Sequence, residues 1–227
     1  MTNAPMSSRR AIFFNFVASK LNFIITLSAT MVLARLLAPE EIGVYSVGAG
    51  LILLAHQLRD GGVSTYLIQE AHLTRERIQS AVGVASLLAF SMMMILLLIS
   101  GFVGNFYDNK GLTDVIAYSS LNFLFVPLSS VIRALLQRDM QFQHLFKIST
   151  SANLIGALST VLLAYNGHSY MSLVWGGIIG NIVSLSLGLV FVSSIKYLMP
   201  SLSEWRRVIN VGGYVTATNL VIHCALL

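Results

Sequence analysis

The sequence predicts an all-α protein, a polytopic transmembrane helix bundle with one six-helix lobe and the start of a seventh helix. Of its 227 residues, 56% are hydrophobic and only 10% are charged, whereas soluble domains carry roughly 25% charged residues. The apolar residues gather in stretches of about 20 residues or more, the length at which a helix crosses a bilayer. These stretches lack the alternation of apolar and polar residues that barrel strands show, so helices are expected.

Six of the stretches are expected to be spans of an N-terminal lobe that covers residues 1–200. They lie near 11–37, 42–69, 80–106, 114–136, 148–165 and 171–195. A seventh stretch starts near residue 208, so residues 201–227 are expected to hold the truncated start of a second lobe. The first stretch is too long for the apolar core of a signal peptide, which has roughly 7–15 residues, and is expected to be retained.

Proline and glycine indicate where two of the spans start, bend or break. Pro39 with Glu40 and Glu41 favours a helix start, because proline fits the first turn and acids complement the positive end of the helix. Pro127 is expected to kink the fourth span, since it removes a backbone hydrogen bond. The glycine pair at 61–62 could break the second span and expose backbone groups to a cavity.

The basic residues predict the orientation of the chain in the membrane. Ten of them lie at the N-terminus or in the connections after the second, fourth and sixth spans: Arg9, Arg10, Arg75, Arg77, Arg133, Arg138, Lys147, Lys196, Arg206 and Arg207. The alternate connections hold only Lys110. The positive-inside rule therefore predicts a cytoplasmic N-terminus, and the chain is expected to be a multi-pass protein of the cytoplasmic (inner) membrane.

The sequence also contains a weak internal repeat. The segment RRAIFFNFVASKLNFII (9–25) aligns with RRVINVGGYVTATNLVI (206–222), with paired arginines and with Ser/Thr and Asn at equal spacing. Parallel repeats related by an axis along the membrane normal are a transporter architecture. The chain is therefore expected to be a fragment or truncated product, with one lobe and the first helix of another.

Polar residues form stripes on three helices. The stripe on the first helix, at spacings of three and four residues, comprises Asn15, Ser19, Asn22, Thr26 and Thr30. Comparable stripes contain Asn153 on the fifth helix and Asn181 on the sixth, beside a GxxxG match at 176–180. Two interpretations stay open: small and polar residues let membrane helices pack closely, or the stripes contact a polar substrate.

Three charged residues are expected deep in the membrane. Lys20 lies ten residues beyond Arg10, and Asp60 lies ten residues before Glu70, so both are expected near the midplane. Charges at that depth must face protein or a wet cavity. A buried pair that only fixes the packing is one interpretation. The other is a site for an anionic substrate, because Lys20 and Arg59 supply two cations against one anion.

Arg35, near the end of the first span, has two interpretations. Its side chain either extends outward to the membrane surface or guards the outer mouth of a pathway.

The motifs that are missing from the sequence exclude several functions. The sequence has no metal-ligand motif, no glycine-rich phosphate loop and no GxSxG, so neither an enzyme nor a cofactor is expected. The basic residues are scattered singly, so no nucleic-acid partner is expected.

Three segments together resemble the Wzx-type oligosaccharide-lipid flippases of the polysaccharide transporter family. They are ARLLAPEEIGVYSV (34–47), LRDGGVSTYLIQ (58–69) and RALLQRDMQF (133–142). The wider superfamily includes multidrug exporters of the MATE kind and peptidoglycan-lipid flippases. The resemblance implies two six-helix lobes, usually with two further helices, around a central cavity. It further implies alternating-access transfer of undecaprenyl-pyrophosphate-linked oligosaccharide to the periplasmic leaflet for O-antigen, capsule or exopolysaccharide.

On this resemblance, Lys20 and Arg59 would attract the pyrophosphate, and Asp60 would be the partial counter-charge that tunes the two cations. Sugar hydroxyls would contact the polar stripes at Asn22, Asn153 and Asn181. Other polysaccharide assembly proteins are possible partners beside the lipid bilayer. Two alternatives stay open: a cation-coupled drug or small-molecule exporter of the same superfamily, and a non-transporting membrane component or enzyme of envelope polysaccharide assembly. The short outer connections argue against the enzyme.

Overall fold

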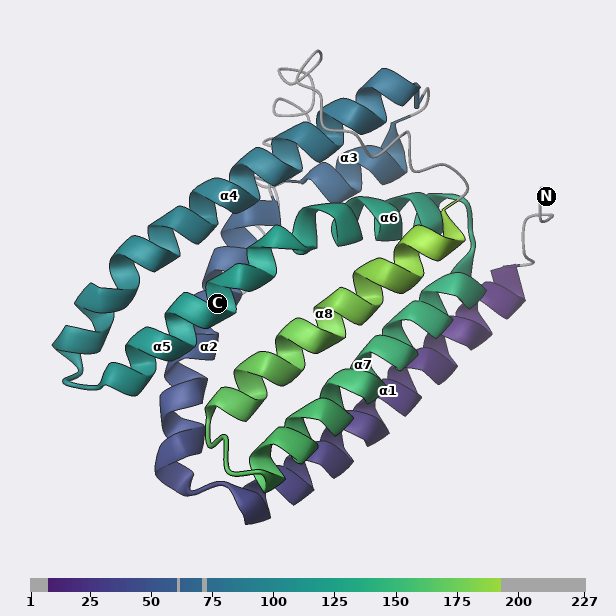
Figure 1. The fold of residues 1–227 in the computed structure, drawn as a ribbon. Coiled ribbons are helices and arrows are strands. Elements are labelled where there is room, and N and C mark those ends of the chain that lie inside the picture. The colour runs from purple at the N-terminus through teal and green to yellow at the C-terminus, as the bar shows by residue number, and fades with distance from the viewer. Residues whose placement is uncertain (1–7, 61, 71–72, 193–227) are drawn as a thin grey trace, which may run out of the picture.

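The computed structural model describes residues 8–60, 62–70 and 73–192 of the chain. Within these ranges it is an all-α bundle without strands, as predicted (Figure 1). The helices are α1 (Ser8–Leu36), α2 (Pro39–Asp60), α3 (Val63–Gln69), α4 (Arg75–Phe106), α5 (Lys110–Ser120), the 3₁₀ helix η1 (Leu121–Leu124), α6 (Val126–Arg138), α7 (Phe142–Tyr165) and α8 (Met171–Phe191). The predicted seventh stretch lies outside the described residues.

Five helices of the described part are long and apolar enough to cross a membrane: α1, α2, α4, α7 and α8. The consecutive helices α5, η1 and α6 make a sixth span if they are counted as one bent segment. Large apolar side chains cover the outside of these helices, with Leu98 76%, Phe102 73% and Phe23 64% exposed. A surface of this kind suits lipid rather than water, so the chain is a multi-pass membrane protein.

The second span differs from the prediction of one helix over 42–69. The helix α2 ends at Asp60, and the short helix α3 begins at Val63. Between them Gly62 has a φ of 71°, a left-handed conformation that glycine adopts without a steric cost. The predicted break is confirmed at Gly62. Arg59 and Asp60 lie in the last turn of α2, and their expected match in depth with Lys20 stays a prediction.

The fourth span is bent, as the proline predicted. The segment Lys110–Leu124 and the helix α6 meet at an angle of 47°. Pro127 lies in the first turn of α6, and its missing N–H cannot bond to the carbonyl oxygen four residues back. The bend therefore falls just before Pro127, at η1.

The connection after the fourth span is much shorter than the predicted connection over 133–147. The helix α6 continues to Arg138, and α7 already begins at Phe142. Assigning Arg133 to a cytoplasmic loop was therefore wrong, because Arg133 lies inside α6. The polar residues around it lower the hydropathy of the segment without ending the helix.

The helices α7 and α8 pack together closely, and α1 lies along the other side of α7 (Figure 1). A Cβ atom on Gly176 would come within 1.8 Å of Thr160 Oγ1, and one on Gly156 would lie 3.1 Å from the carbonyl oxygen of Gly176. Only glycine allows two backbones to approach to this distance. The predicted packing role of the GxxxG segment is confirmed.

The helices alternate in direction. Helices α1, α4 and α7 begin at one end of the bundle, where α6 and α8 end; the α1–α2, α4–α5 and α7–α8 turns lie at the other (Figure 1). The basic residues are concentrated at one end. The first end carries Arg75, Arg77, Arg138 and Lys147 beside Glu70, Glu76 and Asp139, and the second carries Arg35 and Lys110 beside Glu40, Glu41, Asp108 and Asp114.

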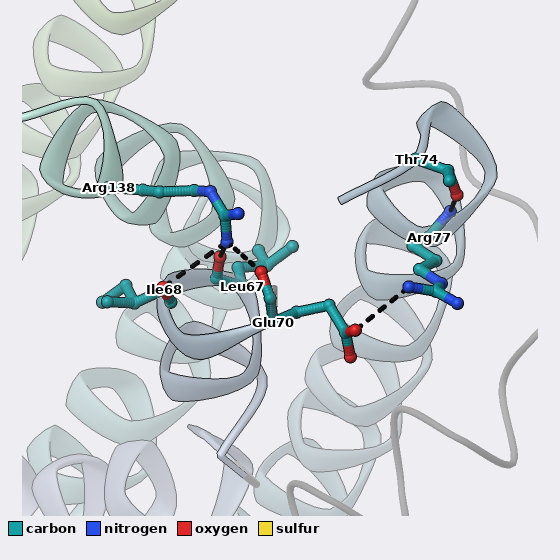
Figure 2. Close-up of polar contacts among 6 residues, drawn as sticks. All are labelled: Leu67, Ile68, Glu70, Thr74, Arg77 and Arg138. Carbon is teal, nitrogen blue, oxygen red and sulfur yellow. Dashed lines mark hydrogen bonds and ion pairs between the residues drawn. The ribbon is translucent and has the colours of Figure 1, made fainter. Parts of the chain in front are cut away.

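A polar cluster joins three helices at the basic end. Arg138 Nη1, from the end of α6, donates to the carbonyl oxygens that close α3, those of Leu67, Ile68 and Glu70 (Figure 2). The Glu70 carboxylate in turn pairs with Arg77 Nη1 of α4 at 3.0 Å. The last carbonyl groups of a helix have no partner within it, so a cation suits this position.

Candidate functional site

A cavity of about 640 Å³ lies among α1, α7 and α8, with Tyr45 of α2 and Arg133 of α6 in its wall. Its size falls within the range of roughly 300–1,000 Å³ that is usual for small-molecule sites. Its hydrogen-bonding residues are Asn22, Thr26, Thr30, Tyr45, Arg133, Ser149, Asn153, Thr160, Asn181 and Ser184. Most of the remaining wall is glycine and alanine, so the backbones of α7 and α8 come close to the cavity.

The three asparagines singled out in the sequence meet at this cavity, one from each of three helices. Asn153 Nδ2 donates to the carbonyl oxygen of Asn22 at 3.1 Å, to Asn22 Oδ1 at 3.0 Å and to Thr26 Oγ1 at 3.3 Å. These bonds fasten α1 to α7. The two interpretations of the polar stripes are therefore compatible, because the same groups pack helices and line a cavity.

Asn181 is held by η1 and not by α1. Its Nδ2 donates to Asn122 Oδ1 at 2.8 Å, and Asn122 is buried, with its own Nδ2 bonded to the carbonyl oxygen of Ser119 at 3.0 Å. In the described part of the chain, the side-chain oxygens of Asn153 and Asn181 accept no hydrogen bond. They remain available as acceptors for hydroxyl groups in the cavity.

Arg133 is the one charged residue in the wall of this cavity, among the residues that the structure describes. Its Nη2 donates to Ser184 Oγ of α8 at 3.1 Å. The remaining guanidinium donors have no protein partner within the described ranges. Sequence reasoning missed Arg133 as a site residue by counting it with the loops. The signal was present, because the predicted span 114–136 already contained it.

A smaller cavity of about 220 Å³ shares Arg133 and Ser149 with the larger one. It lies between α1, α6 and the start of α7, and its wall is largely aromatic and aliphatic: Phe14, Ala18, Phe142, Leu145, Phe146 and Ile148, with Asn15 and Gln137. Arg133 thus stands where a polar cavity meets an apolar one.

The predicted charged site is not assembled at either of these cavities. Lys20 is exposed, with its Nζ 5.3 Å from the centre of the Phe16 ring. It is two residues from Asn22, which turns it about 200° away around the helix. Arg59 is buried at the end of α2 with 6% of its surface exposed, and the side chain of Asp60 lies outside the description. Arg35 is exposed in the last turn of α1.

Comparisons with known proteins identify the chain's relatives. The model of a family described as "Polysaccharide biosynthesis protein" matches residues 32–225. The Lipopolysaccharide biosynthesis protein WzxC of Escherichia coli (strain K12) is 27% identical over 192 residues, which are 84% of this chain and 39% of WzxC. An "Uncharacterized membrane protein in cps region" of Klebsiella pneumoniae is 26% identical over 179 residues, 78% of this chain and 36% of the relative.

The chain spans under two fifths of the length of these relatives. No solved structure matches it. The matches confirm the resemblance to Wzx-type proteins that the three sequence segments indicated. The chain therefore belongs to the polysaccharide biosynthesis protein family.

Proposed function

We propose that this chain takes part in moving lipid-linked oligosaccharide units across the cytoplasmic membrane by alternating access, and that the 640 Å³ cavity receives the headgroup. The observation that carries the proposal is the chemistry of the cavity wall. It presents one cation, Arg133, among neutral hydrogen-bonding groups from three helices. A lipid pyrophosphate joined to sugars has the matching chemistry, an anion beside many hydroxyl groups.

The charge of Arg133 supports an anionic ligand. A charged side chain within a membrane span is costly unless it has a partner or faces water. No acidic residue lines the cavity with Arg133 among the described residues, so the counter-charge can come from the ligand. The planar guanidinium also matches phosphate oxygens in a two-bond geometry. This proposal assigns the pyrophosphate to Arg133 instead of to Lys20 and Arg59.

The amide groups support a ligand rich in hydroxyls. Asn153 and Asn181 use their NH₂ groups on the protein and keep their side-chain oxygens as acceptors. Sugar hydroxyls are donors that can bond to such oxygens. In this proposal Asn22, Asn153 and Asn181 contact the oligosaccharide, and the chain itself performs no chemical reaction.

We place the basic end of the bundle, where α1 begins, in the cytoplasm. Support comes from the distribution of the basic residues, since Arg75, Arg77, Arg138 and Lys147 lie toward this end and only Arg35 and Lys110 of the described basic residues lie toward the other. The headgroup would then enter from the side of the smaller cavity and leave toward the end where Arg35 lies. A complete cycle requires a second lobe to close the pathway in turn.

A binding measurement tests the proposal. The full chain in lipid nanodiscs is titrated with undecaprenyl pyrophosphate, as wild type and as Arg133→Ala, Arg133→Lys and Lys20→Ala. Hydrogen bonds to charged groups are worth about 1.5–3 kcal/mol, so Arg133→Ala should weaken binding roughly ten- to hundredfold. Arg133→Lys should lose less, and Lys20→Ala should bind as wild type. Equal affinity of wild type and Arg133→Ala for the lipid would refute the assignment. Weaker binding by Lys20→Ala would instead assign the pyrophosphate site to Lys20.

A further inference from the structure

The fourth span has an interruption at which its two arms can change angle. The arms Lys110–Leu124 and Val126–Arg138 meet at 47°. At the junction the Phe125 N–H bonds to the carbonyl oxygen of Asn122, three residues back, at 3.0 Å. Pro127 contributes no N–H two residues later. Sharp bends in helices arise at interruptions of this kind.

One face of α8 holds both arms. Asn181 bonds to Asn122 on η1, before the bend, and Ser184 accepts from Arg133 on α6, after it. Asn181 and Ser184 are three residues apart, which places them on the same face of α8. One turn further on, Gly188 allows close approach, since a Cβ atom there would lie 3.0 Å from Ile132 Cγ2. The angle of the bend is thus fixed against a single straight helix.

The groups that hold the bend also belong to the cavity. Arg133, Asn181 and Ser184 all line it, whereas Asn122 is buried with only 9% of its surface exposed. A ligand bonded to Asn181 Oδ1 or to the remaining donors of Arg133 pulls on the same two side chains that hold the arms. A ligand changes a conformational equilibrium only through different affinities for the two states, and this pull supplies that difference if the ligand fits the released geometry of the two side chains better.

We propose that Asn181–Asn122 and Ser184–Arg133 form a clamp on the bent span, and that occupancy of the cavity releases it. An anionic, hydroxyl-bearing headgroup engages Arg133 and Asn181, and the angle between α5 and α6 changes in response. Asn122 is a positioning residue that acts through Asn181 and does not touch the ligand. The identity of the ligand rests on the proposed function, whereas the clamp acts without any ligand.

Distances across the bend test the clamp. Spin labels are placed at Asp114 of α5 and at Asp139, just beyond α6, which are both exposed, by Cys substitution in a Cys224→Ala background. The full chain is studied in nanodiscs by pulsed electron paramagnetic resonance, without ligand. Polar contacts between membrane helices each shift an equilibrium about threefold on average, so Asn181→Ala should raise the minor distance population about threefold. Asn122→Ala should do the same, because it removes the same bond.

Two further variants keep the result interpretable. Asn153→Ala is the matched control, since it makes the same change in the same cavity but removes bonds to α1 only; its distances across the bend should equal those of wild type. Ser184→Ala removes one atom and is the mildest change, so it decides the question if Asn181→Ala fails to fold. An unchanged distance distribution in both Asn181→Ala and Ser184→Ala overturns the clamp.

Addition of undecaprenyl pyrophosphate to the labelled wild-type chain tests the coupling. The lipid should raise the same minor population that Asn181→Ala raises. Binding without a change in distance overturns the coupling. Failure of the lipid to bind contradicts the proposed function instead, and the ligand-free variants still decide the clamp.

Discussion

Two cations within the spans, Arg133 and Lys20, are both exposed but have different neighbours. Arg133 faces a cavity with polar walls and bonds to Ser184. Lys20 lies on the exposed side of α1, over the ring of Phe16. Position along the chain does not separate these cases, because both residues interrupt apolar sequence. What separates them is the neighbouring helix, since α6 packs against α8 while this face of α1 is bare in the described part of the chain.

Arg138 is expected to contribute to stability and not to binding. Its guanidinium satisfies carbonyl oxygens at the end of α3, so Arg138→Ala should lower the free energy of unfolding by about 1–3 kcal/mol. Thermal unfolding of the purified protein in detergent measures this. Arg35→Ala, at an exposed arginine, is the control and should stay within about 0.5 kcal/mol of wild type. An Arg138→Ala protein as stable as Arg35→Ala would show that the cluster in Figure 2 is not stabilising.

At the scale of the helices, the α7–α8 contact is expected to tolerate added volume at one glycine and not at its neighbour. Gly176 and Gly177 are neighbours on α8, but a Cβ atom would lie 1.8 Å from Thr160 Oγ1 at Gly176 and would meet nothing within 4 Å at Gly177. Gly176→Ala should therefore cost about 1–3 kcal/mol of stability, while Gly177→Ala should be neutral. Unfolding of both variants in the same detergent compares them directly. Equal stability of the two would mean that α7 and α8 are not packed as described.

Hydropathy and proline predicted most of the elements, because the apolar stretch of a lipid-facing helix is about as long as the helix itself. The spans, the bend before Pro127 and the break at Gly62 follow from such local rules. The end of the fourth span did not, because α6 is partly polar where it packs inside the bundle. Polar periodicity placed Asn22, Asn153 and Asn181 on helix faces, but their meeting at one cavity depends on which helices are neighbours. Predicting Arg133 as a site residue also requires knowing which helices are neighbours.

At the scale of the whole molecule, the concentration of basic residues at one end predicts the topology. Asp139 lies in the α6–α7 turn at the basic end, and His168 lies in the α7–α8 turn at the other end; both are exposed. In a Cys224→Ala background, a membrane-impermeant maleimide added from the periplasmic side should label His168→Cys and spare Asp139→Cys. Labelling of Asp139→Cys with protection of His168→Cys would invert the orientation and the proposed direction of transport.

The relatives are more than twice as long as the matched part of this chain, so the claim that this lobe itself receives the headgroup is the central one. Photo-crosslinking tests it most directly. A photoreactive amino acid replaces Gly177, where the cavity wall has open space, or Leu98, an exposed apolar residue on α4. Membranes that contain radiolabelled undecaprenyl-pyrophosphate oligosaccharide are then irradiated.

If the cavity holds the headgroup, the Gly177 position should give a labelled adduct that is lost when Arg133→Ala is added, with only weak labelling from the Leu98 position. Lipid that merely surrounds the bundle would label Leu98 at least as strongly as Gly177, and it would do so whether or not Arg133 is present. That result would contradict the assignment of the cavity as the headgroup site.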